Sequence, residues 1–139
     1  MSGLDDESRK SLVEYRLERA YDTMKEAALL TEKGYYNAAV NRLYYACYYA
    51  TSSLLLKHKI EAKTHAGVKS MLGLHFVSKN LIPIHIGKIL STLFEKRQSG
   101  DYDDFIYCDK EMTDELSVQA QTFIDYISKF VNEENPSLE

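Results

Sequence analysis

The sequence has few residues that interrupt helices or form disulfide bonds: two prolines, six glycines and two cysteines in 139 residues. It has no tryptophan. Proline and glycine are the main breakers of regular structure, so their scarcity predicts few loops. Cys47 and Cys108 have no CxxC partner, and we expect both to be reduced thiols without a disulfide. This composition excludes a disulfide-stapled secreted domain and a Pro/Gly-rich disordered chain.

The chain also lacks long apolar runs and an excess of basic charge. No run approaches the roughly 20 apolar residues that a membrane-spanning helix needs, and the N-terminus is acidic, unlike a signal peptide. We therefore expect a soluble, cytoplasmic protein without a membrane partner. With 17 basic and 21 acidic residues the net charge is −4. That balance excludes the broad basic face that binds duplex DNA non-specifically, so any contact with nucleic acid would be local.

Signatures of metal and cofactor chemistry are missing as well. The four histidines share no metal-ligand spacing with one another or with a cysteine. There is no glycine-rich phosphate loop, no nucleophile elbow and no paired Glu-x-x-His on a helix. We expect no metal and no cofactor, and the residues alone favour a binding domain over an enzyme.

Hydrophobic residues recur at helical spacing along most of the chain, and no segment shows sustained alternation. The pattern predicts an all-α fold, an up-and-down bundle of four to five helices in a single domain of residues 1–139 with its core in 5–132. We expect 133–139 to be a flexible tail, and leave Leu138 and Glu139, which could derive from an expression vector, out of functional reasoning. The predicted helices span residues 5–33, 35–58, 64–80, 85–98 and 110–132.

The second predicted helix carries no charge except Arg42 between residues 35 and 56, which is typical of a helix enclosed by its neighbours. The first predicted helix is amphipathic, with Tyr15 and Ala28 among its apolar positions. We expect Gly100 to stop the fourth helix, and residues 101–109 to form an ordered acidic loop packed on the body. The side chains expected to meet in one core are Val40, Leu43, Cys47, Leu90, Leu93, Phe123 and Ile127.

Three Tyr-Tyr pairs surround Arg42 within residues 34–50. A guanidinium among aromatic rings could hold a phosphate or carboxylate through two parallel hydrogen bonds, with Tyr45 and Tyr49 beside it. The alternative is an internal ion pair, because buried charges are normally paired. The candidate acids for that pair are Glu14, Glu18 and Asp101.

Two further motifs are KTHAGV at residues 63–68 and RQSGDY at residues 97–102. Thr64 is a good N-cap, and the helix that follows disfavours protonation of His65, which we expect to be a neutral hydrogen-bonding residue. Arg97 lies at the predicted end of the fourth helix, where it would either contact a ligand or pair with Asp101 to pin the loop.

Together, the 34–50 motif, the KTHAGV segment and the RQSGDY segment resemble those of HEPN (higher eukaryotes and prokaryotes nucleotide-binding) domains. The resemblance covers roughly residues 12–131. It implies a helical bundle that forms a homodimer, places arginine beside a cleft, and is often encoded with a minimal nucleotidyltransferase in toxin-antitoxin pairs. In ribonuclease members an Arg, usually followed by a polar residue, precedes a His by about five or six positions. Arg97 and Gln98 match the first two, whereas Tyr102 stands in the place of the His.

Three functional hypotheses follow. The first is a nucleotide- or RNA-binding domain of a two-component module with a nucleotidyltransferase partner, whose ligand meets Arg97, Gln98 and Arg42, with Tyr45 and Tyr102 beside them. The second is a metal-independent endoribonuclease toxin in which Arg97 stabilises the scissile phosphate and Tyr102 replaces the His. The third is a structural interaction domain in which these residues form internal pairs.

Overall fold

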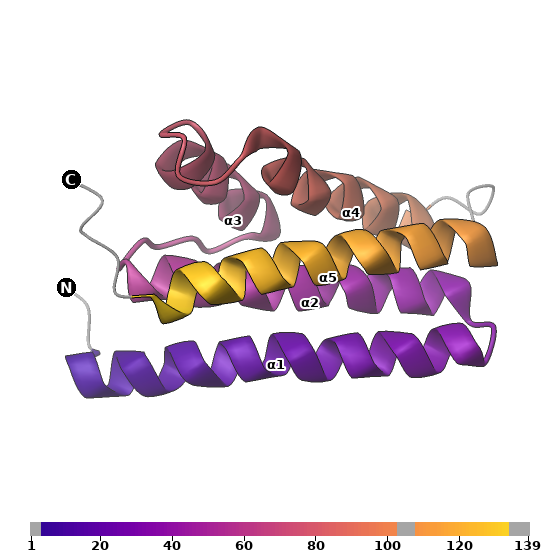
Figure 1. Ribbon diagram of the computed structural model, residues 1–139, viewed down its shortest axis with the longest axis horizontal. Coiled ribbons are helices and arrows are strands. Elements are labelled where there is room, and N and C mark those ends of the chain that lie inside the picture. Colours follow the sequence, from indigo (N-terminus) through magenta and orange to yellow (C-terminus); the bar gives the residue numbers. More distant parts are fainter. Residues whose placement is uncertain (1–3, 103–107, 134–139) are drawn as a thin grey trace.

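The computed structural model describes residues 4–102 and 108–133, and for 98–102 it describes the helical backbone alone. Within these residues every regular element is a helix, which confirms the predicted all-α class. The elements, drawn in Figure 1, are α1 (Asp6–Glu32), α2 (Tyr36–Lys57), α3 (His65–Leu72), the π-helical turn η1 (Gly73–Val77), α4 (Ile84–Tyr102) and α5 (Lys110–Asn132).

Helix α2 is the centre of the bundle. It packs against α1, α3, α4 and α5, as its nearly uncharged sequence predicts. Helices α1 and α2 run antiparallel, and α3 and α4 lie on the far side of α2 and α5 from α1 (Figure 1). The turn between α1 and α2 contains Gly34 at φ +82°, a left-handed conformation that glycine adopts without strain.

Side-chain caps begin three of the helices. The carboxylate of Asp5 accepts a hydrogen bond from the backbone N–H of Ser8, and that of Asp109 accepts one from Met112. The predicted cap Thr64 accepts from the N–H of Gly67 at 2.8 Å. These caps satisfy backbone donors that have no partner inside the helix, so they define where α1, α3 and α5 begin.

The predicted core is confirmed. Its seven members are each at most 1% exposed: Val40, Leu43, Cys47, Leu90, Leu93, Phe123 and Ile127. Cys47 and Cys108 are buried free thiols, as expected, and burial raises the pKa of both.

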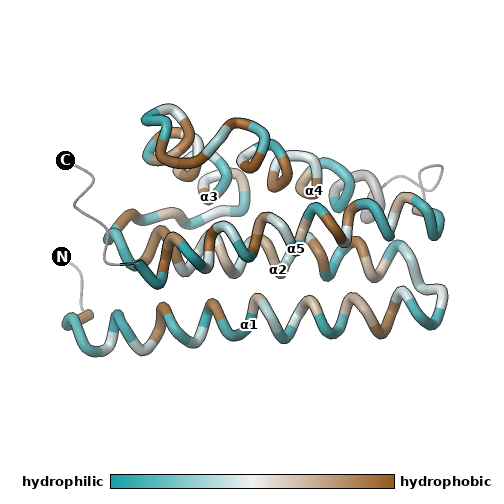
Figure 2. Tube along the Cα trace, in the orientation of Figure 1, coloured by the Kyte–Doolittle hydropathy of each residue, from teal (hydrophilic) through white to brown (hydrophobic). Residues whose placement is uncertain are grey.

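Two of the apolar positions predicted for the first helix do not face the core. Tyr15 is 59% exposed and Ala28 is also exposed, whereas Val13 and Thr23 are buried. Hydrophilic and hydrophobic residues alternate along α1 at helical spacing (Figure 2). The face that packs on the bundle passes through Val13, Leu17 and Ala20, and Tyr15 lies off that line.

Two predicted boundaries also differ from the structure. The third predicted helix is α-helical only from His65 to Leu72 and continues as the π-helical turn η1. Helix α4 runs through Gly100 to Tyr102, so Gly100 does not stop it, and 101–102 belong to a helix rather than a loop. A glycine weakens a helix interior by about 1 kcal/mol, which neighbouring turns can offset. Residues 103–107 of the predicted acidic loop lie outside the described residues.

Stability should fall as the pH drops from about 7 to 5, in part because of His58. Its ring packs on Phe76 with centroids 5.5 Å apart, and Nε2 is buried without a hydrogen bond among the described residues. Burial and then Lys57 lower its pKa below the ordinary 6.5. The unfolded chain therefore binds the proton first, and the stabilisation present above about pH 6.5 is lost as the pH falls through the folded-state pKa.

Urea unfolding of wild type and His58→Gln at several pH values checks this prediction. The variant should have a shallower decline in free energy of unfolding over the acidic range. The control is His85→Gln, which removes an exposed histidine at the start of α4. A decline equally steep in wild type and His58→Gln would contradict the assignment.

Candidate functional site

Arg42, Tyr45 and Arg97, three of the predicted ligand-binding residues, meet where α2 packs on α4. The guanidinium carbon of Arg42 lies 5.0 Å from the centre of the Tyr45 ring, and that of Arg97 lies 5.6 Å from the same ring. Arg97 also donates to the Tyr45 hydroxyl at 3.5 Å and lies 5.3 Å from the ring of Tyr44. Cation-π contacts of this kind hold both guanidinium groups in place.

Both arginines line one pocket of about 400 Å³, which we call the Arg42–Arg97 pocket. Three of its side chains are cationic, two carry amides, and none of the described residues lining it is acidic. An open pocket with this lining attracts anions. Its lining residues are Leu30, Asn37, Ala38, Val40, Asn41, Arg42, Lys96, Arg97 and Cys108.

One wall of the pocket is tied to the turn before α5. The amide oxygen of Asn37 accepts a hydrogen bond from the backbone N–H of Cys108 at 2.7 Å. Since Cys108 is buried, this bond holds the start of α2 against the segment that leads into α5. The pocket is therefore formed by α1, α2, α4 and the residue before the α5 cap.

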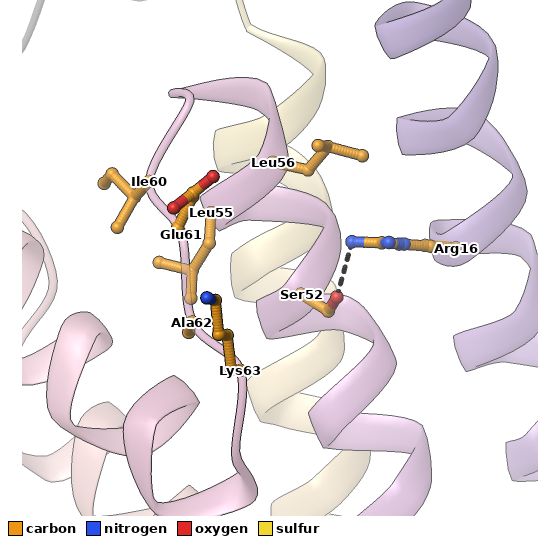
Figure 3. A pocket seen from close by; sticks show the side chains of 8 residues that line it. All are labelled: Arg16, Ser52, Leu55, Leu56, Ile60, Glu61, Ala62 and Lys63. Atoms are coloured by element: carbon orange, nitrogen blue, oxygen red, sulfur yellow. Dashed lines mark hydrogen bonds between the residues drawn. The ribbon is translucent and has the colours of Figure 1, made fainter. Parts of the chain in front are cut away.

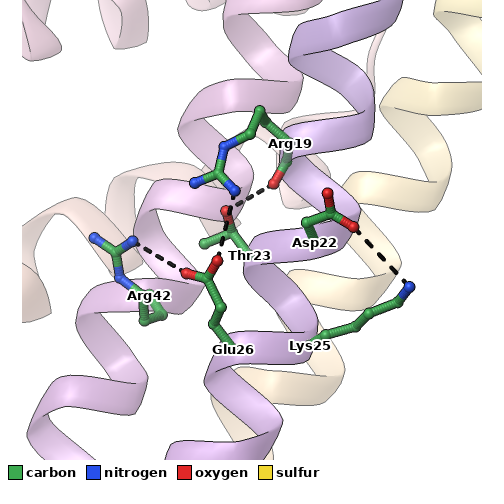
Figure 4. A network of polar contacts seen from close by, with 6 residues as sticks. All are labelled: Arg19, Asp22, Thr23, Lys25, Glu26 and Arg42. Carbon is green, nitrogen blue, oxygen red and sulfur yellow. Dashed lines mark hydrogen bonds and ion pairs between the residues drawn. The ribbon is translucent and has the colours of Figure 1, made fainter.

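Arg42 has an ion-pair partner that was not among the predicted acids, of which Asp101 has its side chain outside the described residues. Glu26 on α1 contacts Arg42 at 3.4 Å through one carboxylate oxygen and Arg19 at 3.5 Å through the other (Figure 4). Glu14 and Glu18 are exposed. The antiparallel register of α1 on α2 brings the C-terminal half of α1, and not its N-terminal half, beside Arg42.

A single carboxylate between two arginines leaves the group with net positive charge. Arg19 resembles Arg42 in its surroundings: its guanidinium carbon lies 5.3 Å from the Tyr49 ring. Both arginine side chains are 29% exposed. Arg42 is thus paired and still reaches the pocket, so the two sequence interpretations of this residue are not exclusive.

His65 is brought to this site by the fold, although the sequence placed it in a separate motif. Its Nδ1 lies 2.7 Å from the hydroxyl of buried Tyr44, and its ring stacks on Tyr48 with centroids 4.4 Å apart. Burial and then Arg97 lower the pKa of His65. A neutral hydrogen-bonding histidine was predicted, and these contacts agree. The pKa of His65 is lowered by burial and by Arg97, whereas the sequence argument attributed the neutral ring to the helix that follows Thr64.

The remaining predicted site residues are not placed by the structure. Gln98 and Tyr102 lie on the last turns of α4, and their side chains are outside what is described. Arg97 stands inside α4 rather than at its end, because the helix extends to Tyr102. Its predicted pairing with Asp101 also falls outside the described side chains.

A second pocket of about 260 Å³ lies between α1, α2 and the segment before α3 (Figure 3). Arg16 points into it and donates to the hydroxyl of Ser52 at 2.9 Å. Glu61 and Lys63 line it together, so its charge is mixed. None of the predicted site residues whose side chains are described lines it.

Within the described part of the chain, no three His, Cys, Asp or Glu side chains are grouped as a metal site would require. No helix there is long and apolar enough to cross a membrane.

A family model, the HEPN domain, matches residues 13–131. The chain belongs to the HEPN domain family. This HEPN domain is 30% identical over 125 residues to a UPF0332 protein of Thermotoga maritima, covering 90% of this chain and 95% of that protein. It is also 30% identical over 133 residues to "Putative toxin MJ0605" of Methanocaldococcus jannaschii, covering 96% and 98% of the two chains. A second protein of that organism, "Putative toxin MJ0142", is 28% identical over 126 residues.

Proposed function

We propose that this HEPN domain binds a phosphate group of a nucleotide or RNA in the Arg42–Arg97 pocket. The observation that carries the proposal is that Tyr45 contacts both guanidinium groups at the edge of a pocket that Lys96 also lines. Guanidinium groups are suited to phosphate because their planar fork donates two parallel hydrogen bonds to its oxygens. The asparagine amides in the lining can add further donors.

The tyrosines offer a second type of contact to such a ligand. Tyr45, Tyr48 and Tyr49 are half-buried, with neighbouring ring centroids about 6 Å apart. The exposed faces of aromatic rings stack with nucleic-acid bases, whereas arginines hold the phosphates. The combination favours a nucleotide or a single strand over a simple anion.

We further propose that the domain acts as a homodimer in a two-component, toxin-antitoxin-like module with a nucleotidyltransferase partner in the cytoplasm. Support comes from its membership of the HEPN family and from the names of two relatives, which both begin with "Putative toxin". The family resemblance supplies the expectation of a dimer and of the partner.

A second candidate is a metal-independent endoribonuclease, which the HEPN resemblance implies and with which the word "toxin" in the names of two relatives agrees. Arg97 would stabilise the scissile phosphate and Tyr102 would take the place of the motif His. A phenol with a pKa near 10 is a poor general base at neutral pH, so we expect slow cleavage if any. RNA cleavage by purified wild type that is lost in Tyr102→Phe would establish this activity instead.

The proposed binding site is tested by two matched variants, Arg42→Ala and Arg19→Ala. Each removes an arginine that contacts Glu26 and a tyrosine ring, but only Arg42 lines the pocket. We expect Arg42→Ala to weaken binding of ATP or a short single-stranded RNA about tenfold or more, as loss of a charged hydrogen bond does. Fluorescence anisotropy with labelled ligand measures the effect.

Arg19→Ala should keep nearly wild-type affinity. Equal losses in both variants would show that Glu26 and its arginines act through the stability of the α1–α2 contact. If wild type binds neither ATP nor RNA, the binding function is wrong and the interaction-domain hypothesis is favoured.

A further inference from the structure

The hydroxyl of Tyr44 determines which nitrogen of His65 carries a proton. Tyr44 is 1% exposed, and its hydrogen bond with Nδ1 of His65 is 2.7 Å long. A buried phenol proton needs an acceptor, and in the described residues no other acceptor bonds this hydroxyl. Burial raises the pKa of Tyr44, so the phenol keeps its proton. The hydroxyl therefore donates, and Nδ1 accepts.

A histidine whose Nδ1 accepts a hydrogen bond carries its proton on Nε2 when the ring is neutral. Burial and then Arg97 on α4 lower the pKa of His65 and favour the neutral ring. The other groups that face His65 are the rings of Tyr44, Tyr45 and Tyr48 on α2. None of these is an acid that would stabilise an imidazolium. Nε2–H is left without a hydrogen bond to any described residue, on a half-buried side chain.

His65 and Arg97 lie against the same two rings. The ring centroid of His65 is 5.6 Å from that of Tyr44 and 5.5 Å from that of Tyr45. The guanidinium carbon of Arg97 is 5.3 Å and 5.6 Å from the same two centroids. Stacking on Tyr48 fixes the plane of the imidazole. A polyphosphate, or two successive phosphates of a strand, is long enough to meet both groups.

We propose that His65 is a second phosphate ligand beside Arg97, held by Tyr44 as the Nε2–H tautomer so that it donates a neutral hydrogen bond to a phosphate oxygen. This inference rests on the proposed function, since it adds a residue to the same binding site. It assigns His65 a role in binding and not in catalysis: with Nε2 protonated, the imidazole has no free lone pair with which to act as a base. His65 does not replace the histidine missing from the RQSGDY segment.

The tautomer is tested on wild-type protein by long-range proton–nitrogen NMR of ¹⁵N-labelled histidine side chains. The result expected at neutral pH is a protonated Nε2 and an unprotonated Nδ1 for His65. In Tyr44→Phe, which removes only the hydroxyl, this preference should weaken. A proton on Nδ1 in wild type would overturn the inference, whatever the binding results.

The ligand role is tested by the affinity of wild type, His65→Ala and His65→Gln for ATP and for a single-stranded RNA. We expect His65→Ala to bind about tenfold more weakly, and the side-chain amide of His65→Gln to restore part of the loss. Loss with ATP and RNA alike identifies a phosphate contact common to both, and loss with one alone identifies the source of the phosphate. Circular dichroism checks that each variant is folded.

Wild-type affinity in His65→Ala, together with weakened binding in Arg42→Ala, would reject His65 as a ligand and leave the proposed function standing. Absence of binding in wild type would reject the proposed function, and with it the ligand role of His65. The two failures are therefore distinguishable.

Discussion

Replacing Arg97 with alanine is expected to weaken binding of ATP or single-stranded RNA by about 100-fold, because two charged hydrogen bonds to phosphate are lost together. Arg97 lines the Arg42–Arg97 pocket, and its contacts with the rings of Tyr44 and Tyr45 fix the position of its guanidinium group. Fluorescence anisotropy measures the affinity. Arg97→Lys, which keeps the charge but loses the fork, should fall between wild type and Arg97→Ala.

Circular dichroism and the mass in solution provide the controls for Arg97→Ala. Both should match wild type, with a mass that corresponds to the proposed dimer. A variant that unfolds or becomes monomeric would show that Arg97 stabilises the fold or the dimer and is not simply a ligand contact. A monomeric wild type would contradict the proposed homodimer.

The largest expected effect on stability is that of Leu43→Ala, which should lower the free energy of unfolding by about 2–5 kcal/mol. Leu43 is 1% exposed on the central helix, and truncation leaves a cavity that the surrounding helices cannot fill by small movements. Urea unfolding measures the loss. Leu29→Ala is the matched control because Leu29 is 61% exposed, and its effect should stay within about 0.5 kcal/mol. Equal effects would contradict the assigned core.

The helices predicted best are those whose bounds or position follow from local sequence alone, without knowledge of tertiary contacts. Helix α5 begins and ends where predicted, because Asp109 caps it and its buried residues recur every three or four positions. The sequence of α2, in which Arg42 is the one charge between residues 35 and 56, likewise predicted its central position. The predicted fourth helix is shorter than α4 because the prediction ends it before Gly100, although a glycine alone only lowers helix stability.

In the candidate site, contacts within one helix could be predicted from the sequence, whereas contacts between helices could not. Arg42 and Tyr45 lie three residues apart on one helix, so their contact follows from helical spacing. The partner acid did not follow, because Glu26 reaches Arg42 only through the register of α1 on α2. The contact of His65 with Tyr44 joins residues 21 positions apart on different helices. The Thr64 cap predicted where α3 begins, but no local pattern predicts the packing of α3 on α2.

The most direct test of the central claim is an NMR titration with ATP that follows the side-chain Nε–H signals of the arginines. Binding in the Arg42–Arg97 pocket predicts that the signals of Arg42 and Arg97 shift with ligand concentration. The signal of Arg16, which lines the second pocket and donates to Ser52, should stay in place. Shifts centred on Arg16, or saturable binding that leaves the signals of Arg42 and Arg97 unchanged, would contradict the account.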